Sequence, residues 1–131
     1  MTYDQFVGEV QHRAQLGSLG DAVGAIRVTL EALAECLAMD EAENLASQLP
    51  REVGIYLLRS VLVEPVRPTL DEFLEAITLD EGIDAQDAIY QARVVLEMLG
   101  ETVSPEALAP LPQAFRDFMT PDSQGQFKKA A

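Results

Sequence analysis

The segment RVTLEAL at residues 27–33 recurs as RVVLEML at residues 93–99, and this repetition decides the predicted fold. The two copies share Arg, Val, Leu, Glu and Leu in the same order. In each copy the leucines stand three residues apart, which is the spacing of one face of a helix. We therefore predict that each copy belongs to a long amphipathic helix.

The repetition extends along the chain in both directions and keeps its order. The first copy supplies Asp4, Phe6, Val10, Leu37, Leu49 and Pro50, which match Asp71, Phe73, Ile77, Val103, Leu111 and Pro112. Matches that keep their order indicate two copies of one unit of about 60 residues. Both copies open with the same start signal, because Thr2 with Gln5 and Thr69 with Glu72 fit a capping box.

Helical spacing, together with the residues that start or end helices, divides each copy into about four helices. The first two helices of copy one are predicted over residues 3–16 and 21–38, separated by a turn that Gly17 and Gly20 bound. The long helix of copy two is predicted over residues 85–103. A short third helix is expected after Asp40 as N-cap, and a fourth after Pro50. In copy two the corresponding starts are Ser104 followed by Pro105, and Pro112.

The sequence thus predicts an all-α fold with two related subdomains of about four helices each, related by a pseudo-two-fold axis. The first repeat covers residues 1–62, a linker covers 63–68, the second repeat covers 69–120, and a flexible tail covers 121–131.

Composition restricts the classes of partner. The chain has 22 Asp and Glu against 9 Lys and Arg, a net charge of −13, so it repels nucleic acid and anionic lipid. No apolar run reaches the length of about 18 residues needed for a membrane span, and the N-terminus does not have the pattern of a signal peptide. Cys36 is the single cysteine, which fits a reducing compartment. We expect a cytoplasmic protein without membrane insertion.

The segment EALAECLAMDEAENLASQLP at residues 31–50, preceded by a YDQF start at residues 3–6, resembles bacterial proteins of domain-of-unknown-function family 2267. The residues that carry the resemblance in the first copy are Asp4, Phe6, Leu30, Leu33, Glu41, Ala42, Leu45, Gln48, Leu49 and Pro50. The second copy contributes Phe73, Leu96, Leu99, Leu108, Leu111 and Pro112. Cys36 departs from the pattern, since the family more often has a basic residue there. The resemblance implies an all-helical fold and supplies no catalytic residues.

The individual residues that could support chemistry have plainer interpretations. His12 is predicted to face solvent, and Cys36 to be a partly buried small apolar residue. The acidic segment LDEGIDAQD at residues 79–87 does not match the spacing of a calcium loop, and its Asp84 is expected to cap a helix. We therefore predict no catalytic residue, no metal site and no cofactor.

One polar pair occurs in both copies: Arg27 with Glu31, and Arg93 with Glu97. Spacing of four residues puts each pair on neighbouring turns of one helix face. We predict a structural role, in which the arginine ties the second helix to the first. The acid that opens the first helix of each copy, Asp4 or Asp71, could approach the same arginine. The alternative is that Arg27 and Arg93 form twin anion-binding sites.

Three functional hypotheses follow. The preferred one is a non-enzymatic interaction or accessory module that binds a protein partner, because helical repeats create grooves at their junctions. The second is a binding protein for an apolar small molecule or cofactor held between the two halves. The third is an enzyme that uses carboxylates alone, with several acids of raised pKa in one cleft.

Overall fold

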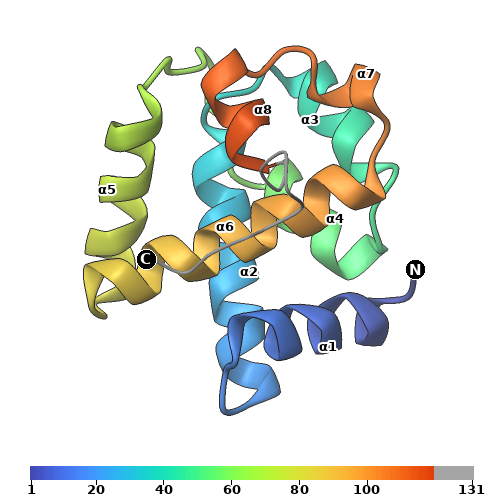
Figure 1. Ribbon diagram of the computed structural model, residues 1–131. Helices are drawn as coiled ribbons and strands as arrows, with labels where there is room; N and C mark the ends of the chain where they lie inside the picture. The colour runs from blue at the N-terminus through green and yellow to red at the C-terminus, as the bar shows by residue number, and fades with distance from the viewer. Residues whose placement is uncertain (120–131) are drawn as a thin grey trace.

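The computed structural model describes residues 1–119, except for the side chain of Glu81. Within this part of the chain every regular element is an α-helix, which confirms the predicted all-α class (Figure 1). The elements in order are α1 (Tyr3–Ala14), α2 (Leu19–Ala34), α3 (Met39–Ala46), α4 (Arg51–Leu58), α5 (Leu70–Glu81), α6 (Ala85–Thr102), α7 (Pro105–Leu108) and α8 (Gln113–Met119). The predicted flexible tail, residues 121–131, lies outside the described residues.

The capping boxes predicted at both repeat starts are present. The Thr2 hydroxyl accepts a hydrogen bond from the Gln5 backbone N–H at 3.1 Å, and the Gln5 side chain accepts one from the Thr2 N–H at 2.9 Å. Thr69 and Glu72 make the same two bonds at 3.1 and 2.8 Å. Each reciprocal pair satisfies two backbone donors that a helix start would otherwise leave unpaired. The first helices of the two halves therefore begin in the same way.

The turn between α1 and α2 differs from the prediction. The first helix ends at Ala14, where Gln15 adopts a left-handed conformation with φ of 56°. Ser18 caps α2 by accepting a hydrogen bond from the Asp21 N–H at 3.0 Å. Gly20 therefore lies inside the first turn of α2 and does not bound the turn, because the serine hydroxyl supplies an earlier start signal.

The third helix also begins earlier than predicted. Ala38 is the N-cap residue of α3, so Asp40 is not the cap but part of the first turn. The Glu41 carboxylate accepts a hydrogen bond from the Ala38 N–H at 2.8 Å, which is the half of a capping box that does not need a polar side chain at the cap. In the second half, Ser104 and Pro105 occupy the predicted N-cap and first helical positions of α7.

The two longest helices, α2 and α6, cross at the centre of the molecule and the others pack around them (Figure 1). Helix α1 contacts α2 and also α6 of the other half, while α5 contacts α6 and also α2. Helix α4 packs on α2, and α8 packs on α6. One continuous cluster of buried apolar residues includes members from both halves.

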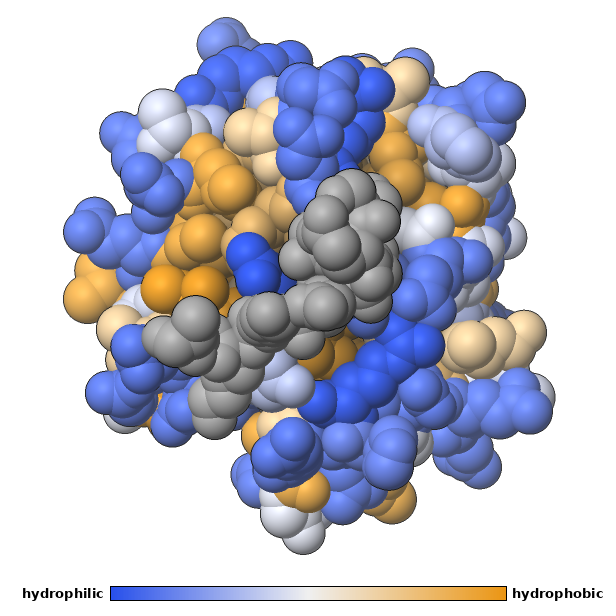
Figure 2. Space-filling model, viewed as in Figure 1, coloured by the Kyte–Doolittle hydropathy of each residue, from blue (hydrophilic) through white to orange (hydrophobic). Residues whose placement is uncertain are grey.

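Aromatic contacts join the helices of the second half. The Phe73 ring on α5 meets the Phe115 ring on α8 edge-on, with centroids 5.1 Å apart. The guanidinium of Arg93 on α6 lies 4.4 Å from the centre of the Phe118 ring on α8. Figure 2 shows hydrophobic residues gathered on this face, over the region between α5 and α8, with hydrophilic residues around them. These contacts fix α8 against both α5 and α6.

The segment between α4 and α5 is tied to the end of α2. The Val66 N–H donates to the Glu35 carbonyl at 2.9 Å, and the Arg67 guanidinium donates to the Cys36 carbonyl at 2.9 Å. These two bonds satisfy carbonyls that the last turn of a helix leaves without an intrahelical partner. Among the helices described, none is both long and apolar enough to cross a bilayer.

Candidate functional site: the groove between α3 and α4

Close approach of α3 and α4 depends on a single glycine. A Cβ atom added to Gly54 would lie 2.9 Å from the carbonyl oxygen of Ala46 and 3.1 Å from its Cβ. Such distances are too short for a normal contact, so only glycine allows the two backbones to meet here. The corner residue Pro50 separates the helices and its carbonyl accepts hydrogen bonds from Val53 and Gly54 at 2.9 Å each, which starts α4 at once.

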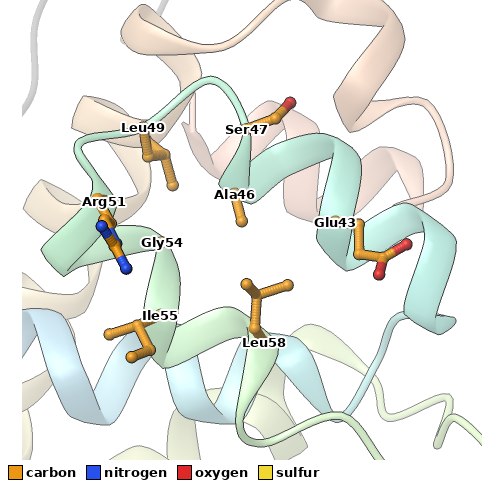
Figure 3. Close-up of a pocket in the computed structure, with 8 residues that line it drawn as sticks. All are labelled: Glu43, Ala46, Ser47, Leu49, Arg51, Gly54, Ile55 and Leu58. Atoms are coloured by element: carbon orange, nitrogen blue, oxygen red, sulfur yellow. The ribbon is translucent and has the colours of Figure 1, made fainter.

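An open groove of about 540 Å³ runs beside this contact (Figure 3). We call it the α3–α4 groove. Its lining residues come from both helices and the corner between them: Glu43, Ala46, Ser47, Leu49, Arg51, Gly54, Ile55 and Leu58. Most of these side chains are apolar or small, so the groove presents an apolar surface that solvent can reach.

Two large apolar side chains on the α4 wall are exposed although most apolar groups of the chain are buried. Ile55 is 49% exposed and Leu58 is 39% exposed. They stand three residues apart and therefore share one face of α4. The opposite face of α4 buries Val53 and Leu57 completely. Helix α4 is thus apolar on two sides, of which only one is used by the core.

Charged residues mark the two ends of the groove. Figure 3 shows Arg51 at one end and Glu43 at the other, with Ala46 and Leu58 between them. Helix α3 as a whole carries Asp40, Glu41 and Glu43 and no Lys or Arg, and of these Glu43 lines the groove. The groove therefore combines an apolar surface, one acidic end and one basic end.

The polar pair predicted in the first half is brought together by α2, with a third residue that sequence analysis did not include. Arg27 Nη1 donates to Glu31 Oε1 at 3.1 Å. Arg59, the C-cap residue of α4, donates to Glu31 Oε2 from Nη2 at 2.8 Å and from Nε at 3.1 Å. The residue that joins this pair is therefore the positively charged Arg59 at the end of α4. The expected approach of Asp4 to Arg27 was wrong. Arg27 nevertheless has a carboxylate within hydrogen-bonding distance, as the predicted structural role requires.

The corresponding glutamate of the second half has a different main partner. Glu97 Oε1 accepts from Arg13 Nη1 on α1 at 2.8 Å. Arg93 contributes a favourable charge to Glu97 and stacks on Phe118. Spacing within one helix could not reveal Arg13, since it lies in the other half of the chain. The one local sign was the spacing of Glu9 and Arg13, which the structure joins at 2.8 Å.

Three carboxylates converge on Arg13 and form what we call the Arg13 cluster: Glu9, Glu97 and Glu101. Glu101 binds the guanidinium through both oxygens, at 2.7 and 2.9 Å. Glu97 is only 7% exposed, and its Oε2 is buried without a hydrogen-bond partner. Burial raises the pKa of Glu97, and this outweighs the attraction of Arg13. Nε, Nη1 and Nη2 of Arg13 all donate to carboxylates, so the cluster holds α1 and α6 together as a structural contact.

Comparison with known protein families identifies the family of this chain. Residues 3–118 match the family described as "Uncharacterized conserved protein (DUF2267)". The chain belongs to the DUF2267 family. This confirms the resemblance noted for residues 31–50, and the match covers both halves. A search of curated proteins finds no match.

The remaining candidates in this DUF2267 protein have structural surroundings. His12 is exposed on α1, as predicted. Cys36 is 8% exposed, and burial raises the pKa of its thiol to about 11. Asp84 caps α6, where its carboxylate accepts from the Gln86 N–H at 3.1 Å. In the part of the chain that the structure describes, no three residues of metal-binding type are grouped closely enough to hold an ion.

A second hollow of about 390 Å³ lies between the halves, beside α2 and the turn from α5 to α6. Its lining mixes apolar residues such as Leu16 and Ile83 with the charged residues Asp21, Arg27 and Asp80. The hollow is open and half polar, so it suits an apolar molecule less well than an enclosed apolar cavity would. The α3–α4 groove is therefore the stronger candidate site.

Proposed function

We propose that this DUF2267 protein is a non-enzymatic interaction module that binds a protein partner through the α3–α4 groove. The observation that carries the proposal is the exposed apolar face of α4 at Ile55 and Leu58. Apolar side chains that line a groove are the usual receptor for the apolar stripe of a partner helix. Burial of such a pair on docking is worth about 25 cal/mol for each Å² removed from water.

The shape of the groove favours a protein over a small molecule. Small-molecule sites bury most of the ligand surface and place a few polar groups to orient it. The α3–α4 groove is open along its length, and its charged residues, Glu43 and Arg51, stand at its ends. A helix can lie in such a groove and leave its polar face in water.

The arrangement of helices supports a proposed pseudo-two-fold relation between the halves. The contact of α1 with α6 has its counterpart in the contact of α5 with α2, and α4 on α2 corresponds to α8 on α6. The halves differ most at the third helix, because α3 has 8 residues and α7 has 4. The groove thus occurs where the two halves differ most, which fits a specialised binding surface. The buried free thiol of Cys36 fits the proposed cytoplasmic location.

Site-specific cross-linking tests this function. A photoreactive residue at Leu58 should trap a stoichiometric partner in the native host, and the same residue at Leu79 on α5 should not. Leu79 is the matched control because it is 78% exposed and lies on another helix. The variants Ile55→Glu and Leu58→Glu should lose the partner, while Leu79→Glu keeps it. A partner retained by both groove variants would show that binding occurs elsewhere.

A further inference from the structure

The charges around the α3–α4 groove specify the kind of segment that it accepts. We infer that the groove binds a basic amphipathic helix, with its N-terminal end at Glu43 and its C-terminal end at Arg51. This inference rests on the proposed function and adds to it the chemistry and direction of the partner segment.

The acidic end of the groove selects basic side chains. Glu43 is the charged residue that α3 contributes to the lining, and it is exposed. Asp40 is also exposed and lies three positions earlier, so it shares this side of α3. Lysine or arginine residues beside the apolar stripe of a docked helix would meet these two carboxylates.

The charge of the whole chain reinforces the selection. With a net charge of −13, the protein repels acidic partners and a second copy of itself, and it attracts basic ones from a distance. A second copy is therefore disfavoured as the occupant of the groove, although the apolar surface alone would accept one.

The two ends of the groove set the direction. A helix carries partial positive charge at its N-terminus and partial negative charge at its C-terminus. Glu43 at one end therefore favours the N-terminus of a docked helix, and Arg51 at the other favours its last carbonyl groups (Figure 3). The reverse direction would place like charges together at both ends.

Three synthetic peptides provide the test. Each carries leucines at positions i, i+3 and i+7 of a helical host, flanked by lysine in the first peptide, glutamine in the second and glutamate in the third. Binding is measured by fluorescence anisotropy with the full chain. The lysine peptide should bind at least about tenfold more tightly than the glutamate peptide, and the difference should shrink in 0.5 M salt because exposed charges are screened.

Protein variants separate a local effect from a general charge effect. Glu43→Lys should weaken binding of the lysine peptide at least about fivefold, since one attraction becomes a repulsion. Glu75→Lys changes the net charge equally from an exposed position on α5 and should have a much smaller effect. A spin label on the N-terminus of the peptide should broaden the amide resonance of Glu43, and one on the C-terminus that of Arg51.

Each outcome separates the inference from the function on which it rests. If all three peptides bind equally, or if Glu75→Lys weakens binding as much as Glu43→Lys, the groove binds helices but the charge selection is wrong. If the labels broaden the opposite ends, the direction is wrong. If no peptide binds and the cross-linker at Leu58 traps nothing, the proposed function itself is wrong.

Discussion

Arg13 on α1 and Glu97 on α6 are joined by a 2.8 Å hydrogen bond, although 84 positions separate them in the chain. The Glu97 side chain is almost completely buried, at 9% exposed, whereas the Arg13 side chain remains partly accessible, at 28% exposed. Tyr90 strengthens the same junction, since its hydroxyl donates to the Arg13 carbonyl at 2.8 Å. The start of the first half is thereby fixed to the long helix of the second.

Replacement of Arg13 by Met should destabilise the protein by about 2–3 kcal/mol, because it leaves the buried Glu97 carboxylate without its main partner. Urea unfolding at neutral pH measures the loss. The control is the double variant Arg13→Met with Glu97→Gln, which removes the buried charge and should recover most of the stability. A double variant no more stable than the single one would assign the loss to packing of the arginine stem.

The raised pKa of Glu97 predicts a specific pH dependence. An unfolded Glu titrates near about 4.3, so the folded state binds the extra proton between that pH and the raised pKa. The contribution of this carboxyl to stability is therefore full below the unfolded pKa and falls as the pH rises through the folded one. The stability of the wild type relative to Glu97→Gln should decrease as the pH rises above the unfolded pKa of about 4.3. Urea titrations at several pH values measure this difference, and an increase with pH would mean that the attraction of Arg13 outweighs desolvation.

Gly54→Ala should separate α3 from α4 and destabilise the protein by about 1–2 kcal/mol, because the added Cβ meets the backbone of Ala46. Gly8→Ala on α1 is the matched control. A Cβ at Gly8 meets nothing within 4 Å, so this change should stabilise the helix by about 0.5–1 kcal/mol. Thermal unfolding compares the two, and equal effects would show that the close contact at Gly54 is not needed.

Cys36 should react slowly with an exposed-thiol reagent in the native protein and quickly in denaturant. With a pKa of about 11, only about one thiol in a few thousand is ionised at pH 7.5, and the side chain is also buried. Replacement by Ala should leave partner binding unchanged. Rapid native labelling at neutral pH would instead reveal an activated thiolate.

The starts of the two repeats could be read from the sequence because each has a threonine cap with a recognisable partner. Thr2 and Thr69 identified the starts of α1 and α5, because Gln5 and Glu72 stand three positions later and complete the capping boxes. The start of α3 was misplaced because its N-cap, Ala38, has no polar side chain, and the compensating bond comes from Glu41. Gly20 was misread because a glycine near a turn looks the same whether it lies before or after the cap.

The candidate site depends on contacts that no local pattern contains. Arg59 reaches Glu31 and Arg13 reaches Glu97 only because the helices fold back on one another. The groove arises from the contact of Gly54 with Ala46, which is a tertiary feature. One signal was available in the sequence: Ile55 and Leu58 give α4 a second apolar face beside the one that carries Val53 and Leu57.

The exchange of opening helices, with α1 on α6 and α5 on α2, bears on how such a chain can be divided. A fragment of residues 1–62 would expose the side of α1 that faces α6 in the intact protein, and its long helix would lack the covering of α5. Under the proposed symmetry, two such fragments would each offer the surface that the other lacks. If that symmetry holds, a single unit would be suited to form a homodimer, and the intact chain would correspond to such a dimer with its two subunits joined by a peptide link.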